Sequence, residues 1–244
     1  MLPIRDSVLR LRTPVVTWTL IALNAAVFLY ELTLSPGALD QLIAQYGLLP
    51  ARYSSAKAVP GLDPENFWPF WTNMFLHAGF LHILFNMWTL WLFGGTLEDR
   101  MGRPRFLFFY LLCGLSASLV HFAFNLQSSL PALGASGAIA GVMGAYLVLY
   151  PRASITVLFP VLFIPLFFDL PAIFYLGFWF LIQFFSGTAS IVNPQHGGGI
   201  AWWAHIGGFS AGIVWVALLH SKEKNIYRHF TRQAFRPRWG RWHG

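Results

Sequence analysis

Charged side chains are scarce in this chain: they make up 10% of its 244 residues, whereas 56% of the residues are hydrophobic. A soluble domain carries about 25% charged residues. The scarcity excludes an ordinary soluble protein, because a single soluble core could not bury this much apolar surface, and it indicates an integral membrane protein. The net charge of +7 does not indicate nucleic-acid binding, because the basic residues lie in a few clusters at segment ends.

Cysteine is nearly absent as well. Cys113 has no partner for an internal disulfide, and its apolar surroundings predict a small packing residue. The sequence also shows no cleavable signal peptide. Its first apolar run, Val15 to Leu34, has the length of a span and no cleavage signature, so we expect it to remain as a helix.

The chain is rich in long apolar runs. A helical span needs roughly 20 mostly apolar residues. The run from Ile155 to Phe168 is shorter and is broken by Pro160 and Pro165, so we interpret it as interfacial or re-entrant. We therefore expect an all-α membrane protein with six transmembrane helices, at about 15–34, 82–98, 106–126, 136–150, 170–188 and 202–220.

The positions of lysine and arginine predict the orientation of this bundle. With six spans, 14 of the 16 basic residues fall on one side, and only Arg52 and Lys57 fall on the other. The positive-inside rule then places both termini in the cytoplasm. We expect a cytoplasmic N-terminal tail, a six-span membrane domain and a basic cytoplasmic C-terminal tail, over residues 1–14, 15–220 and 221–244.

Ser136 is the most informative polar residue within the predicted spans. A serine in a membrane helix usually bonds to its own backbone or packs as a small residue. Ser136 differs because it begins a helix and lies in Gly134-Ala135-Ser136-Gly137, where glycine allows a tight turn and close backbone approach. Unpaired N–H groups at a helix start can also receive a developing anion, as in an oxyanion hole.

A partner for Ser136 is predicted in the last span. A lone histidine in an apolar stretch is more often a packing residue than a base, but His205 shares its helix face with Gly208 and Gly212. The fourth span offers glycines as well, at 137, 141 and 144. Such small faces let membrane helices approach closely, and both residues lie near the outer ends of spans that run in the same direction. Ser136 and His205 can therefore form a nucleophile and base below the membrane surface.

No carboxylate is expected beside His205. The only ones near predicted spans are Glu31, Glu98, Asp99 and Asp169, and nothing in the sequence places any of them near this histidine. A Ser–His dyad is therefore favoured over a triad, with His205 oriented by packing or by a neutral group.

His82 and Asn86 are four residues apart, hence on one face of the second span, where they could donate hydrogen bonds to an oxyanion. The alternative is a metal site formed by His77, His82 and His205. The sequence has no His-Glu-x-x-His arrangement, and no acid accompanies these histidines, so we expect neither a metal nor another cofactor.

Four short segments follow one another along the chain and together indicate a family. They are His77–Asn86, Gly94–Glu98 with the basic turn after it, Gly134–Gly137, and Ala204–Gly208. Each is weakly specific alone. In this order on a six-span chain they resemble the rhomboid family of intramembrane serine proteases, and the resemblance covers about residues 15–220. It implies a serine endopeptidase that cuts single-span transmembrane substrates near their outer end, without metal or organic cofactor.

The resemblance also implies roles for individual residues. Ser136 would be the nucleophile and His205 the general base, while the oxyanion and its surroundings would involve His82, Asn86, His77 and Gly134. Two positions depart from the family pattern. Many members have Trp-Arg in the first outer loop, where this chain has Trp68-Pro69 and Trp71-Thr72, and some have a tyrosine four residues after the nucleophile, where this chain has Ala140. Another group must then orient His205.

Two other functions remain open at this point. A non-enzymatic relative could bind or escort transmembrane clients, although it would have no need of both Ser136 and His205. A transporter or channel is disfavoured, because the chain has no obvious repeat and almost no carboxylate within its predicted spans. Without an organelle-targeting signal, we expect a bacterial inner membrane.

Overall fold

The computed structural model describes residues 2–54, 66–161, 164–192 and 200–219. Lys57 and the predicted C-terminal tail, 221–244, lie outside the described residues. Each predicted span overlaps one helix, with ends that differ by a few residues. These helices are α1 (Val15–Glu31), α5 (Phe80–Met101), α6 (Arg103–Phe124), α7 (Ser136–Leu149), α8 (Ala172–Val192) and α9 (Trp202–Leu219).

Not all of these helices are equally long. Four, namely α5, α6, α8 and α9, are long and apolar enough to cross a membrane by length and composition. The helices α1 and α7 are apolar but shorter. The structure therefore describes a mostly helical multi-pass membrane protein, and the prediction of six crossings depends on the two shorter helices.

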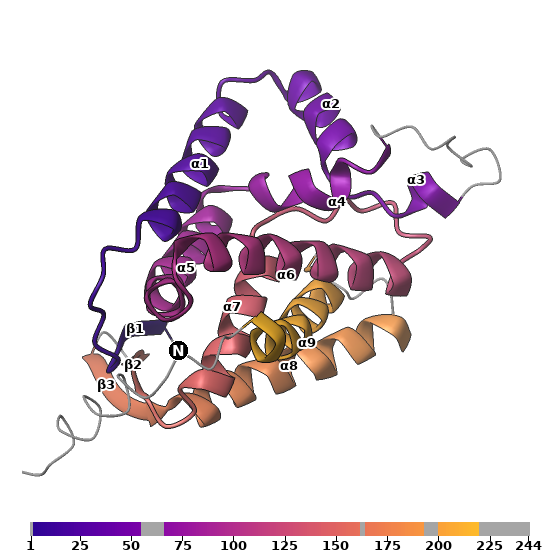
Figure 1. Ribbon diagram of the computed structural model, residues 1–244. Helices are drawn as coiled ribbons and strands as arrows, with labels where there is room; N and C mark the ends of the chain where they lie inside the picture. The colour runs from indigo at the N-terminus through magenta and orange to yellow at the C-terminus, as the bar shows by residue number, and fades with distance from the viewer. Residues whose placement is uncertain (1, 55–65, 162–163, 193–199, 220–244) are drawn as a thin grey trace, which may run out of the picture.

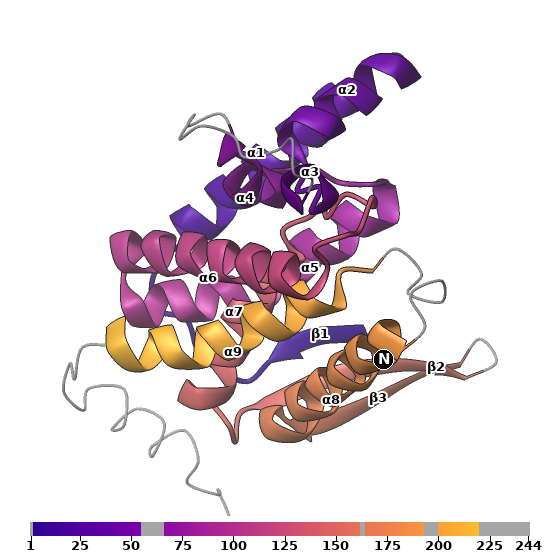
Figure 2. The ribbon, with the colours of Figure 1, turned by 90° about the vertical axis from the view of Figure 1, so that its right-hand side faces the viewer.

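The helix α7 lies at the centre of the bundle, with α5, α6, α8 and α9 around it (Figures 1 and 2). Its residues 137–146 are all buried. The closest neighbour is α9, and the two helices touch through glycine, as the spacing predicts. A Cβ atom at Gly208 would overlap the carbonyl of Gly137, and one at Gly212 would overlap the carbonyl of Gly141. Such close contact is typical of small residues between membrane helices.

The segment before α7 is hydrogen-bonded to the loop between α1 and α5. That loop contains α2 (Pro36–Tyr46), α3 (Ala51–Ser54), α4 (Pro69–Thr72) and the 3₁₀ turn η2 (Asn73–Phe75). Leu48 and Ala132 exchange two backbone hydrogen bonds, of 3.2 and 2.8 Å, and Gly134 donates its N–H to the carbonyl of Asn73 at 2.9 Å. These bonds fix the approach of the chain to Ser136.

The prediction of an all-α protein needs one correction. A three-stranded antiparallel sheet lies beside the bundle, in the order β1 (Leu2–Asp6), β2 (Ser154–Val161) and β3 (Ile164–Pro171) (Figure 2). The run 155–168, interpreted as interfacial or re-entrant, therefore contributes two antiparallel strands, β2 and β3, in which Pro160 and Pro165 are paired. The sequence could not show this, because β1 comes from the predicted N-terminal tail, about 150 residues away along the chain.

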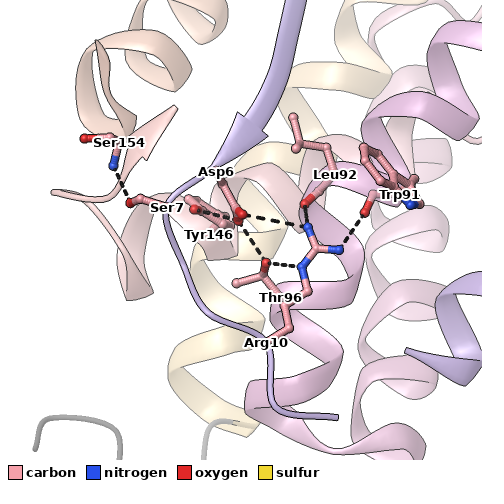
Figure 3. Close-up of polar contacts among 8 residues, drawn as sticks. All are labelled: Asp6, Ser7, Arg10, Trp91, Leu92, Thr96, Tyr146 and Ser154. Atoms are coloured by element: carbon pink, nitrogen blue, oxygen red, sulfur yellow. Dashed lines mark hydrogen bonds and ion pairs between the residues drawn. The ribbon is translucent and has the colours of Figure 1, made fainter. Parts of the chain in front are cut away.

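The N-terminal segment is held by polar contacts as well as by β1 (Figure 3). Asp6 accepts hydrogen bonds from Thr96 of α5 at 2.9 Å and from the Tyr146 hydroxyl of α7 at 3.0 Å. Arg10 donates to the carbonyl of Leu92 at 2.6 Å and to Thr96 at 3.1 Å. Residues expected to form a tail are thus attached to two helices of the bundle.

Candidate active site

Ser136 is the first residue of α7, and no side chain caps the start of that helix. The turn before it requires glycine for two reasons. Gly134 has a φ of +113°, which L side chains rarely adopt, and a Cβ atom there would lie 2.7 Å from the ring of His82. The turn therefore brings the His82 ring against the backbone that leads into Ser136.

Ser136 and His205 meet directly. The Ser136 hydroxyl lies 2.8 Å from Nε2 of His205, which belongs to the first turn of α9. The glycine contacts between α7 and α9 begin directly beside this pair, where Gly208 meets Gly137, and continue one turn further along both helices, where Gly212 meets Gly141. A hydroxyl and an imidazole at this distance can act as nucleophile and general base.

The other ring nitrogen of His205 also has a partner. Nδ1 lies 2.8 Å from Oε1 of Gln183, a buried residue of α8. Gln183 is not among the site residues predicted from the sequence. Its position beside Leu181, Ile182 and Phe184 is a signal that could have identified it, because polar groups at membrane depth are costly.

His82 and Asn86 lie on one face of α5, next to Gly134. Nδ1 of His82 is 3.4 Å from the backbone N–H of Ala78, and an accepting Nδ1 leaves the proton of a neutral imidazole on Nε2. Asn86 donates to the carbonyl of His82 at 2.9 Å. The donors of His82 and Asn86 thus approach the start of α7 from one side.

His77 lies behind His82 and not with Ser136. Its ring packs edge-on against the His82 ring, with 5.2 Å between the centroids, and its backbone N–H donates to the Glu31 carboxylate at 3.2 Å. Neither of its buried ring nitrogens has a hydrogen-bond partner within the described ranges. The structure therefore places His77 as a neighbour of His82.

These groups face a large cavity of about 1610 Å³. Ser136 and His205 line it together with His82 and Asn86, and its walls come from α5, α7, α8, α9 and the segment before α7. His121 of α6 also lines the cavity and was not selected from the sequence. A polypeptide segment could reach the Ser136 hydroxyl through a space of this size.

A metal site would need several ligating side chains close together. Among the residues that the structure describes, no group of three His, Cys, Asp or Glu side chains could hold a metal ion. His77, His82 and His205, the alternative ligand set, do not form such a group. His205 instead uses both ring nitrogens in contacts with Ser136 and Gln183.

Comparison with known proteins identifies related sequences. A family model described as "Rhomboid domain" matches residues 64–222. The chain is 33% identical over 135 residues to "Rhomboid protease GluP" of Bacillus subtilis (strain 168), which is 55% of this chain and 24% of that protein. It is 31% identical over 151 residues to "Rhomboid protein 1, mitochondrial" of Saccharomyces cerevisiae (strain ATCC 204508 / S288c), covering 59% of this chain and 39% of that protein.

A plant protein shows a shorter match. "RHOMBOID-like protein 6, mitochondrial" of Arabidopsis thaliana is 42% identical over 80 residues, which is 33% of this chain and 25% of that protein. The matched part is less than half the length of each of these relatives.

Proposed function

The chain belongs to the rhomboid family, and we propose that it is an intramembrane serine endopeptidase whose catalytic dyad is Ser136 and His205. The observation that carries this proposal is the 2.8 Å contact between the Ser136 hydroxyl and Nε2 of His205, made at the wall of a cavity of about 1610 Å³. A packing serine has no need of an imidazole partner that faces open space.

The reaction would proceed by acyl transfer. Nε2 of His205 takes the hydroxyl proton while Oγ of Ser136 attacks the carbonyl carbon of the scissile peptide bond, which gives a tetrahedral intermediate. The imidazolium then protonates the leaving amine, and the C–N bond breaks to leave an acyl-enzyme. His205 next removes a proton from water, which attacks the ester and restores Ser136.

The oxyanion of the intermediate would lie between the start of α7 and the face of α5. The uncapped N-terminus of α7 offers backbone N–H groups and the positive end of the helix dipole. Nε2 of His82 and the amide of Asn86 add donors from the other side. Gly134 permits this closeness, because any Cβ atom there would collide with the His82 ring. His77 would support His82 from behind.

The proposed substrates are single-span transmembrane proteins, and the surrounding membrane lipid is the second partner. We propose six crossings with both termini in the cytoplasm, which puts the start of α7 toward the outer face. From Ser136 to Leu149 the helix has 14 residues, about 21 Å at roughly 1.5 Å per residue. That length is shorter than a hydrocarbon core of about 30 Å, so the site lies below the outer surface.

We propose that the protein is located in a bacterial inner membrane. One of the relatives above comes from Bacillus subtilis, and the names of the other two contain the word mitochondrial. Localisation of a tagged full-length chain in its native cells would test this part.

The decisive experiment asks whether Ser136 is a nucleophile. A fluorophosphonate probe should label the wild-type protein and fail to label the Ser136→Ala protein, and the same substitution should abolish cleavage of a reconstituted single-span substrate. Ser190→Ala is the matched control, because Ser190 lines the same cavity but donates to the carbonyl of Gly187. Wild-type-like cleavage by the Ser136→Ala protein would refute the proposal. An unlabelled but folded wild-type protein would favour a non-enzymatic relative.

A further inference from the structure

We propose that Gln183 is a positioning residue that holds His205 in the tautomer needed for catalysis. This inference rests on the proposed function of the Ser136–His205 pair. Gln183 comes from α8, whereas the pair comes from α7 and α9, so the site would be completed by a third helix. The side chain of Gln183 is buried, with 5% of the residue exposed, and its Oε1 lies 2.8 Å from Nδ1 of His205.

The first step concerns the orientation of the amide. Nε2 of Gln183 lies 3.3 Å from the carbonyl oxygen of Trp179, one turn earlier in α8. A carbonyl oxygen only accepts hydrogen bonds, so the NH₂ group of Gln183 must face it. Turning the amide over would place two oxygens against each other at Trp179. The Trp179 carbonyl therefore directs Oε1 of Gln183 toward His205.

The second step concerns the proton of His205. Oε1 of an amide is an acceptor, so a hydrogen bond at 2.8 Å requires the proton of the neutral ring on Nδ1. Nε2 then carries the lone pair and faces the Ser136 hydroxyl, also at 2.8 Å. This is the form that can accept the serine proton. In the other tautomer Nε2 would donate to Ser136 and could not act as a base.

The third step is that other nearby groups do not supply this acceptor. Ala140, where some family members have a tyrosine, offers only a methyl group. The rings of Trp179 and Trp202 lie 5.8 and 6.4 Å from the His205 ring, as packing neighbours. In the part of the chain that the structure describes, no carboxylate is hydrogen-bonded to His205; Glu31 is bonded to the N–H of His77 instead. A neutral amide thus occupies the place that an acid takes in a triad.

Two substitutions separate hydrogen bonding from packing. Gln183→Met keeps the length of the side chain and removes the acceptor, whereas Gln183→Glu keeps an acceptor oxygen and adds charge. With a reconstituted single-span substrate, we expect Gln183→Met to lower kcat by about 10- to 100-fold at unchanged KM, because a hydrogen bond to the developing imidazolium is lost. We expect Gln183→Glu to remain active.

The pH profile gives an independent readout. A carboxylate beside Nδ1 stabilises the imidazolium, so Gln183→Glu should move the acidic limb of kcat/KM to higher pH. Among the residues that the structure describes, the ionisable groups that act on His205 are His82 of α5 and His121 of α6, and both substitutions leave them unchanged. An equal loss of kcat in both variants with the wild-type pH profile would mean that Gln183 only fills space, and would overturn the proposal. Wild-type kcat in the Gln183→Met protein would overturn it too.

A measurement on the wild-type protein does not depend on how the two Gln183 variants fold. With ¹⁵N-labelled histidine, and the His205 signals identified by their loss in a His205→Asn protein, the neutral ring should carry its proton on Nδ1. A proton on Nε2 would refute the proposal.

Fluorophosphonate labelling of Ser136 distinguishes failure of the proposed dyad from failure of the proposed role of Gln183. Absence of labelling in the wild type removes the dyad and this role together, whereas labelling with an Nε2 proton removes only the role of Gln183.

Discussion

Two contacts of the bundle differ in what holds them together. Next to the candidate site, α7 and α9 touch through Gly137, Gly141, Gly208 and Gly212, and the backbone of α7 leaves no room for a Cβ atom at Gly208 or Gly212. Further along α5, carboxylates hold the N-terminal segment, here taken to include the first turn of α1. There Glu98 accepts three hydrogen bonds from Val16 and Thr17, of 2.7 to 2.9 Å, and Asp99 accepts one from Leu11 at 3.0 Å.

The two contacts differ in how strictly they fix the distance between the elements that they join. Backbone against backbone cannot yield, so the glycine contact fixes the separation of α7 and α9 and with it the 2.8 Å between Ser136 and His205. A hydrogen-bonded contact tolerates small shifts in distance, because hydrogen bonds form over a range of donor–acceptor distances. The first contact therefore determines the geometry of the site, and the second determines how firmly the N-terminal segment is attached.

The largest effect is expected from a methyl group in the glycine contact. In Gly212→Ala the new Cβ overlaps the carbonyl of Gly141, so α9 must move away from α7. We expect a loss of about 3 kcal/mol in stability and a severe loss of cleavage. Gly177→Ala on α8 is the matched control, because nothing lies within 4 Å of a Cβ atom there. Thermal unfolding of both proteins in detergent checks this, and equal midpoints would contradict it.

A smaller effect is expected at the other contact. Glu98→Ala leaves the N–H groups of Val16 and Thr17 and the Thr17 hydroxyl without their acceptor, at a site where Glu98 is 3% exposed. We expect a loss of about 2 kcal/mol, and about half of that for Glu98→Gln, which keeps one acceptor oxygen. Denaturant or thermal unfolding of the three proteins measures the order, and wild-type stability in Glu98→Ala would speak against this attachment.

The smallest effect is expected from Asp6, and it depends on pH. Burial raises the pKa of the Asp6 carboxyl above its usual value, and hydrogen bonds from Thr96 and Tyr146 and the charge of Arg10 offset part of the rise. A raised folded-state pKa stabilises the fold below the unfolded pKa, and this contribution is lost as pH rises through the folded pKa. Between the unfolded-state pKa and the higher folded-state pKa of Asp6, the wild type should thus lose stability relative to Asp6→Asn as the pH rises.

The control for this pH dependence is Asp40→Asn. Asp40 is an exposed carboxylate of α2, and its replacement should leave the wild-type slope in place. Unfolding midpoints of each protein, measured from mildly acidic to neutral pH, give the slope of stability against pH for both variants and the wild type. If Asp6→Asn retained the full wild-type slope, another group would be responsible.

Prediction from sequence succeeded where local pattern carried the information. The run of glycines on two helix faces predicted that α7 and α9 approach closely, and the positions of Ser136 and His205 at two helix starts predicted their meeting. His82 and Asn86 share a helix face because they are four residues apart. The expected neutral orienting group could not be assigned to Gln183, because its contact depends on how far α8 is shifted along its axis relative to α9.

The sheet shows a different limit. Strand β1 pairs with β2 across about 150 residues. Residues Ser154 to Val157 alternate polar and apolar side chains, as strands do, but a continuous apolar run follows them and obscures this pattern. Proline at two positions argued against a helical span over 155–168, which was correct, but it did not reveal the paired strands. Pairing of distant segments is decided by the fold around them.

The sequence by itself determined that this protein is a membrane protein of apolar helices, that two of those helices have glycine faces, and that a serine and a histidine begin them. These properties follow from composition and from helix periodicity, which are local. Only the tertiary structure decided that Gln183 reaches His205, that the His82 ring occupies the space beside Gly134, and that residues 2–6 form a strand. Each of these depends on the relative positions of whole elements, which packing fixes and no short stretch of sequence contains.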